Sequence, residues 1–150
     1  MTAFRTSRTL PFSPDTVFGA IRDPERLARW WGPNGFTNTF HHFDFKPGGR
    51  WSLTMHGPDG TNYPNESEFT DIDAPALVRI RHISLPEFVL TIGLETQPEG
   101  TLVGWEQVFS DANFAEKVRH IVEPANEQNL DRLTAELQSR DAGGHLPSAG

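Results

Sequence analysis

The sequence predicts an α+β fold in which a curved antiparallel β-sheet of six to seven strands wraps around one long C-terminal α-helix, with two short helices after the first strand. Strand-like segments separated by turns that contain Gly or Pro fill the middle of the chain. Two helix-start signals precede them, and a helical pattern of apolar residues follows them. One long helix across the concave face is the natural cover for the apolar side of such a sheet.

The N-terminal elements have clear local signals. Residues 3–10 are expected to form the first strand. Ser13-Pro14 supplies an N-cap followed by proline at the first helical position, and Asp23-Pro24 repeats the signal for a second short helix. Gly32-Pro33 ends that helix. A strand over 35–45 follows, and four of its residues are phenylalanine: Phe36, Phe40, Phe43 and Phe45.

Five further strands are expected to form an antiparallel meander. In the first of them, Trp51, Leu53 and Met55 alternate with polar residues, which is typical of a half-buried strand with large side chains on its covered face. The turn segments Pro47-Gly48-Gly49 and Pro58-Asp59-Gly60 supply positions with positive φ for tight hairpins. The predicted strands are 50–56, 61–72, 77–85, 87–96 and 101–109.

The last element is predicted to be a helix over about residues 113–139. Asn113 with Glu116 matches a capping box. Two apolar stripes follow, and because they are rotated about the helix axis with Pro124 between them, we expect a kink or break there. Residues 141–150 lack periodicity and are predicted to form a disordered tail, which leaves a single domain over 1–140. The first stripe is Phe114, Val118, Ile121 and Val122, and the second is Leu130, Leu133 and Leu137.

Composition excludes several classes of protein. The 150 residues have a formal net charge of −7, which disfavours binding to nucleic acid and to an anionic membrane surface. There is no cysteine, and no apolar run resembles a signal peptide or a membrane span. We therefore expect a soluble cytoplasmic protein. Four tryptophans and eleven phenylalanines indicate a heavily aromatic core or an apolar pocket.

Four polar residues from separate elements are predicted to point toward the covered side. His82 shares a strand face with apolar neighbours, as do Asn65 and Gln107, and Asn126 falls on the apolar stripe of the last helix. Such a set indicates a polar spot in an apolar pocket or a buried water network. His82 is either a core histidine bonded to a neighbour or a group that orients a ligand or moves a proton. Trp30-Trp31 either gates a pocket mouth or caps the core.

No pattern for a metal, a cofactor or a catalytic nucleophile is found. His41 and His42 point to opposite faces of a strand, and neither His120 nor His145 has a partner four residues on. The sequence has no H-E-x-x-H, G-x-S-x-G, Walker A or G-x-G-x-x-G motif. We expect no metal and no cofactor.

The chain resembles the START-like superfamily, also called SRPBCC or Bet v 1-like, and in particular bacterial proteins of the activator-of-heat-shock-protein-90-ATPase-homologue type. The resemblance covers residues 4–139 and implies a helix-grip fold with a ligand-binding domain. Four segments carry it: Trp30-Trp31-Gly32-Pro33, Asp44-Phe45-Lys46-Pro47-Gly48-Gly49-Arg50-Trp51, Met55-His56-Gly57-Pro58-Asp59-Gly60 and Asn126-Glu127-Gln128-Asn129-Leu130-Asp131-Arg132-Leu133.

The resemblance implies that a small, largely apolar molecule binds between the sheet and the last helix, and the inward aromatic and amide residues agree with this. One alternative is an enzyme of the cyclase, dehydratase or hydrolase type, with His82 as acid-base group and Gln107 and Asn126 as orienting residues. Another is a protein-interaction module of the chaperone-activator kind. A homodimer is also expected, because the aromatic content could leave an exposed apolar patch. The candidate ligand-binding residues are Trp30, Trp51, Met55, Asn65, Phe69, His82, Trp105, Gln107, Val122 and Asn126.

Overall fold

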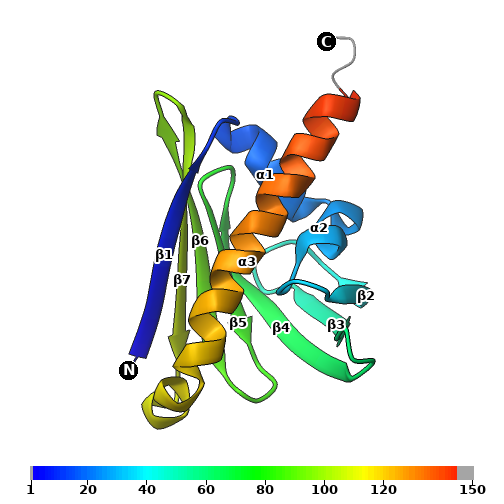
Figure 1. Cartoon of the computed structure of the whole chain (residues 1–150), viewed down its shortest axis with the longest axis vertical. Helices are drawn as coiled ribbons and strands as arrows, with labels where there is room; N and C mark the ends of the chain where they lie inside the picture. The colour runs from blue at the N-terminus through cyan, green and yellow to red at the C-terminus, as the bar shows by residue number, and fades with distance from the viewer. Residues whose placement is uncertain (1, 145–150) are drawn as a thin grey trace.

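Seven antiparallel strands form one curved sheet in the computed structural model, which describes residues 2–144 (Figure 1). The strands are β1 (Thr2–Leu10), β2 (Thr37–Phe43), β3 (Arg50–His56), β4 (Asn62–Asp73), β5 (Leu77–His82), β6 (Phe88–Gln97) and β7 (Gly100–Phe109). Their spatial order is β1-β7-β6-β5-β4-β3-β2. The first strand therefore lies at one edge of the sheet, beside the last strand β7, and β2 lies at the other edge. The helix α3 (Ala112–Gly144) crosses the concave face, which confirms the predicted fold class.

The two short helices follow the first strand as predicted. In α1 (Pro14–Arg22) the Ser13 side chain accepts a hydrogen bond from the Thr16 N–H at 3.2 Å. In α2 (Pro24–Trp30) the Asp23 side chain accepts one from the Glu25 N–H at 3.0 Å. Each cap satisfies a donor that the first helical turn leaves free, so these starts could be identified from local sequence alone.

Two strands are shorter than predicted. The strand expected over 35–45 is confined to Thr37–Phe43, and the strand expected to end at residue 85 ends at His82. Beyond His82 the N–H groups of Ile83 and Ser84 donate to the Glu66 carbonyl, at 2.8 and 3.3 Å, so the chain turns away from the ladder. This turn contains Pro86, which has no N–H to continue a strand.

The start and the middle of α3 differ from the predictions. Asp111, not Asn113, is the N-cap, because its Oδ1 accepts from the N–H groups of Asn113 at 3.0 Å and Phe114 at 3.1 Å. The helix is continuous through Pro124, so the alternative of a break is wrong. Pro124 has no N–H to donate to the His120 carbonyl four residues earlier. Both residues are exposed, so water can replace the lost hydrogen bond.

The end of α3 also lies beyond the predicted boundary. The helix continues to Gly144, so residues 141–144 belong to it rather than to a tail. Glycine lowers helix propensity without excluding the conformation. The rest of the predicted disordered tail, residues 145–150, lies outside the described residues.

The two halves of α3 have different roles. Leu130, Leu133 and Leu137 in the second half are at most 1% exposed and join the main core. In the first half Ile121 is 59% exposed, which corrects its placement on a covered stripe, and Val122 is only half-buried. The helix is therefore anchored at one end and covers the sheet loosely at the other, and this leaves room for a cavity.

Candidate functional site

A cavity of about 190 Å³ lies between the concave face of the sheet and the first half of α3. The segment after α2, at Gly32 and Pro33, forms part of its rim. The sheet side is mainly aromatic and aliphatic, and the helix side carries Ile121, Val122 and Ala125. Eight of the ten residues predicted to bind a ligand line it: Trp51, Met55, Asn65, His82, Trp105, Gln107, Val122 and Asn126.

Trp30 and Phe69, the other two predicted residues, lie behind this wall. Trp30 is 1% exposed and its indole N–H donates to the Ala20 carbonyl at 2.9 Å. Phe69 is completely buried and its ring stacks on that of Trp51, with ring centroids 5.6 Å apart. Neither lines the cavity, because both are used to pack the aromatic core.

Trp31, rather than Trp30, is the tryptophan of this pair that lines the cavity. Its ring centroid lies 5.0 Å from that of Trp51 and 5.9 Å from that of Trp105. The sequence offered a core cap and a pocket gate as alternatives for the pair. In the structure each alternative applies to one residue of the pair, because consecutive residues at a helix end point in different directions. Trp30 packs in the core and Trp31 forms cavity wall.

The aromatic wall contains two buried donors without an acceptor. Within the described residues, Nε1 of Trp51 and Nε1 of Trp105 have no hydrogen-bond partner. A buried donor left unpaired costs about 1–3 kcal/mol. Both indoles belong to the cavity wall, whereas the other two unpaired buried polar atoms of the described residues, Arg26 Nη2 and Asn38 Oδ1, lie away from it.

Arg132 of α3 holds the rim segment in place. Its guanidinium donates to five backbone carbonyls at 2.8–3.0 Å. Burial lowers the pKa of Arg132 from its ordinary value. These contacts fix the segment between α2 and β2, because five acceptors converge on one planar group. The carbonyls belong to Arg29, Trp31, Gly32, Pro33 and Phe36.

Asn129 holds the same segment from one turn earlier in α3. Its side-chain amide donates to the Trp30 carbonyl at 2.8 Å and accepts from the Gly32 N–H at 3.3 Å. Gly32 has a φ of +95°, a conformation that glycine adopts without strain. Sequence reasoning missed both Asn129 and Arg132 as site-forming residues. Asn126, Asn129 and Arg132 follow one another at intervals of three residues, which places them along one side of the helix, and this spacing was the available signal.

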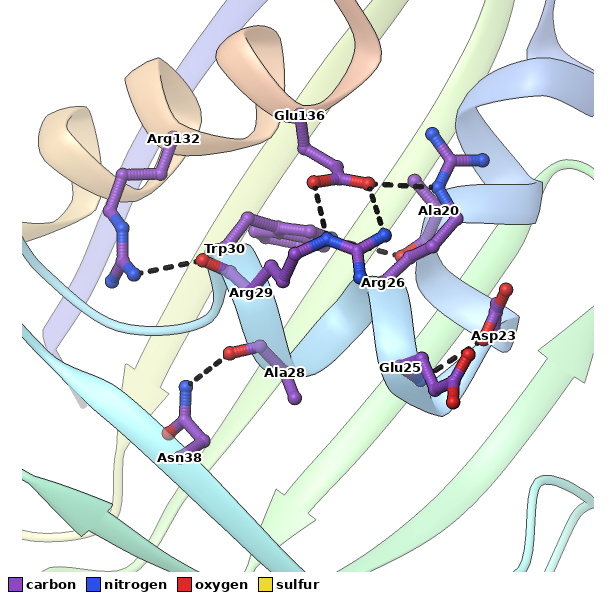
Figure 2. Close-up of polar contacts among 10 residues, drawn as sticks. All are labelled: Ala20, Asp23, Glu25, Arg26, Ala28, Arg29, Trp30, Asn38, Arg132 and Glu136. Carbon is purple, nitrogen blue, oxygen red and sulfur yellow. Dashed lines mark hydrogen bonds and ion pairs between the residues drawn. The ribbon is translucent and has the colours of Figure 1, made fainter. Parts of the chain in front are cut away.

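Glu136 ties α2 itself to α3. Figure 2 shows its carboxylate bound by two guanidinium groups, those of Arg26 and Arg29, through three N···O contacts of 3.0 Å. Burial raises the pKa of Glu136, but the hydrogen bonds from Arg29 and Arg26 outweigh it, so the pKa lies below its ordinary value. The rim is thus supported by a charged contact behind the cavity as well as by Arg132.

The polar groups of the cavity form two pairs. The Asn126 Nδ2 donates to the Gln107 Oε1 at 3.1 Å, which links α3 to β7. The His82 Nε2 lies within hydrogen-bonding distance of the Asn65 Oδ1, which links β5 to β4. The four polar residues predicted to point inward therefore meet in one cavity, although they come from four different elements.

His82 is held on several sides. Its Nδ1 donates to the Pro86 carbonyl at 2.8 Å, and its ring stacks on Phe88 with centroids 4.5 Å apart. Burial lowers the pKa of His82 from its ordinary value, against smaller effects of backbone hydrogen bonds that raise it. At neutral pH the imidazole is therefore uncharged. Because Nδ1 carries the proton of the neutral ring, Nε2 is an acceptor. It can accept from the Ser84 hydroxyl at 3.5 Å, and the Asn65 Oδ1 lies beside it.

Replacing His82 with glutamine should flatten the pH dependence of stability below about pH 6.5. The folded protein holds His82 neutral, so the unfolded chain binds more protons as the pH falls. The stability from this residue is present above the unfolded pKa and is lost as the pH falls toward the lower folded pKa. Urea unfolding across this range measures the slope. The exposed residue His42, changed to glutamine, is the control and should keep the wild-type slope; equal slopes for all three proteins would contradict the assignment.

No cluster of three or more histidine, cysteine, aspartate or glutamate side chains that could hold a metal is present within the part of the chain that the structure describes. Among those same residues, no helix has the length and apolar character needed to cross a bilayer. The predicted homodimer and the predicted cytoplasmic location stay predictions.

Comparison with known proteins identifies the family. Residues 11–138 match the family model described as "Activator of Hsp90 ATPase homolog 1-like protein". A comparison with curated proteins gives no match. The fold is of the START, or SRPBCC, type, as the sequence resemblance implied.

Several solved structures share this fold. A solution structure of a protein from Arthrobacter aurescens is 24% identical, with 91% of this chain and 86% of that chain covered and a TM-score of 0.84. The crystal structure of the AHSA1 protein from Silicibacter pomeroyi is 22% identical, with coverage of 93% and 99% and a TM-score of 0.76. An AHSA1-like protein from Aeromonas hydrophila is 19% identical, with coverage of 95% and 94% and a TM-score of 0.73. At these identities the likeness concerns the fold alone.

Proposed function

This chain belongs to the family of Activator of Hsp90 ATPase homolog 1-like proteins, and from that premise we propose that its cavity binds a small, largely apolar molecule. Proteins of this family and fold commonly bind ligands or partners. The observation that carries the proposal is the cavity under α3, with three tryptophans in its wall and two pairs of polar side chains. Apolar walls with a few convergent polar groups are typical of small-molecule sites.

The size of the cavity limits the ligand. A protein cavity of about 150 Å³ lined by aliphatic and aromatic residues accommodates benzene. The volume of about 190 Å³ found here therefore suits one aromatic ring with a small substituent. The neighbouring faces of Trp31, Trp51 and Trp105 favour an aromatic ligand, because rings attract each other in offset and edge-to-face arrangements.

The two alternatives have less support. An enzyme that uses His82 as a general acid or base needs a ring nitrogen directed at the substrate, whereas both nitrogens contact protein atoms. The chaperone-activator alternative is supported by the family description, but no specific feature of the described surface favours it. Binding in the cavity is therefore the function that the geometry supports best.

Filling the cavity from α3 should abolish binding without unfolding the protein. Ala125 lines the cavity and is half-buried, so Ala125→Leu would occupy ligand space. Toluene is a suitable probe, and its affinity, measured by NMR titration, should fall at least about tenfold. Loss of a favourable fit of about 1.4 kcal/mol corresponds to that factor.

Ala135 provides the matched control, because it lies on the same helix and is exposed. The Ala135→Leu variant should bind toluene as the wild type does. Failure of the wild type to bind toluene at all would contradict the proposed function, as would equal binding by Ala125→Leu.

A further inference from the structure

We infer that the cavity selects an uncharged, planar ligand that carries a hydrogen-bond donor beside an acceptor, as a primary carboxamide on an aromatic ring does. This inference rests on the proposed function, because it concerns the ligand of the same cavity. Two features of the wall carry it: the side chains that line it are uncharged, and Asn126 is paired with Gln107 in a fixed orientation.

The first feature excludes ionised ligands. Among the described residues, none that lines the cavity is an aspartate, glutamate, lysine or arginine. Arg132 is close to the rim, but its guanidinium is occupied by backbone carbonyls. His82 is engaged at both ring nitrogens. A carboxylate or an ammonium group would therefore enter without an opposite charge, and burying an unpaired ion is strongly unfavourable.

The second feature defines the polar group that fits. The bond between the two amides uses one N–H of Asn126 and the carbonyl oxygen of Gln107. It leaves the Asn126 Oδ1 as an acceptor and the Gln107 Nε2 as a donor, and neither makes another hydrogen bond within residues 2–139. Because the bond fixes which atom of each amide faces the other, this amide pair offers one acceptor and one donor, whereas the Nε1 atoms of Trp51 and Trp105 are themselves buried inside the wall.

A ligand carboxamide complements this pair at both positions. Its N–H can donate to the Asn126 Oδ1, and its carbonyl oxygen can accept from the Gln107 Nε2. A carboxylate of the same shape has only acceptors, so one of its oxygens would face the Asn126 Oδ1 without a hydrogen between them. A ketone of the same shape satisfies the Gln107 donor and leaves the Asn126 acceptor unpaired. The amide pair therefore selects the ligand's polar substituent by hydrogen bonding, and the tryptophans pack against its aromatic ring.

Three probes of nearly equal size and the smaller toluene test this without altering the protein. Toluene reports on the apolar cavity alone, and benzamide, acetophenone and benzoate differ in the substituent. Titration calorimetry and NMR at neutral pH should show benzamide as the tightest. Acetophenone should bind roughly tenfold more weakly, as expected for one lost buried hydrogen bond. Benzoate should bind at least about a hundredfold more weakly, because its charge stays unpaired.

A double variant tests whether the preference for benzamide arises from Gln107 and Asn126. Gln107→Leu combined with Asn126→Leu removes both partners of the pair, so neither is left unsatisfied. It should bind toluene at least as well as the wild type and lose the preference for benzamide over acetophenone. Gln138→Leu, at an exposed position of α3, is the matched control and should keep the preference.

The outcomes separate this inference from the proposed function. If toluene fails to bind the wild type, the proposed function fails. If toluene binds but benzoate equals or exceeds benzamide, or acetophenone equals benzamide, the inference is overturned and the proposed function stands. If the double variant folds and retains the benzamide preference, the assignment to Asn126 and Gln107 is overturned. Should the double variant not fold, the four wild-type affinities still decide the selectivity.

Discussion

Replacing Arg132 with methionine should lower the free energy of unfolding by about 3 kcal/mol or more, measured by urea denaturation. Methionine keeps much of the side-chain length but removes every donor from the five carbonyls that the guanidinium binds. An unsatisfied buried polar group costs about 1–3 kcal/mol, and several of these carbonyls are partly buried. The segment from Trp31 to Phe36 should then lose its fixed position, so toluene binding by the folded variant should also weaken.

Arg119→Met is the control for this experiment. Arg119 lies on the same helix, and its guanidinium pairs with Glu116 and Glu123 at the surface. Exposed ion pairs of this kind contribute little to stability. The free energy of unfolding of Arg132→Lys should lie between those of Arg132→Met and Arg119→Met, because an ammonium group keeps the charge but lacks the planar arrangement of donors. Equal stability of Arg132→Met and Arg119→Met would refute the role assigned to Arg132.

Replacing Trp30 with alanine should cost about 3–5 kcal/mol of folding free energy, the range found for removing a buried large aromatic side chain. Trp30 is 1% exposed and packs edge-on against both Trp31 and Trp105. The substitution also leaves the Ala20 carbonyl without the indole donor that it accepts from. Figure 2 shows Trp30 of α2 beside the Glu136 cluster, with its indole bonded to Ala20 of α1, so its removal affects the packing of both short helices.

Trp31→Ala provides the comparison, because it makes the same substitution at the adjacent residue. Trp31 is half-buried and lines the cavity, so its loss should cost less stability than the loss of Trp30. Toluene affinity of the folded Trp31→Ala protein should nevertheless fall at least about tenfold, since one aromatic wall is missing. Greater destabilisation by Trp31→Ala than by Trp30→Ala would contradict the division of the pair into core and wall.

The α2–α3 contact explains why a cavity persists in so small a domain. Glu136 and Arg132, drawn in Figure 2, and Asn129 fix the rim segment and α2 to the buried half of α3. The other half of α3 is then free to span the sheet without packing tightly on it. A well-packed core would close a void of this size if its walls could move inward. Here the second half of the helix keeps the first half at a distance.

Several features of the protein follow from the sequence because they depend on residues that are near neighbours in the chain. The caps Ser13 and Asp23 need only the next three residues of chain. The inward direction of His82 and Gln107 follows from the two-residue period of a strand, which does not depend on the rest of the fold. The order of strands and helices, and with it the α+β class, has the same local origin.

Other parts are decided only when distant elements meet. The sequence suggested Trp30 as a ligand contact, but the packing of α2 against α3 buries Trp30 and leaves Trp31 at the cavity. Arg132 has an ordinary helical position in the sequence, and its role arises from carbonyls about a hundred residues earlier in the chain. Hydrophobic periodicity predicts which face of an element is covered. How closely that face is covered depends on the shapes of both partners, and this is why only the tertiary structure could establish the cavity.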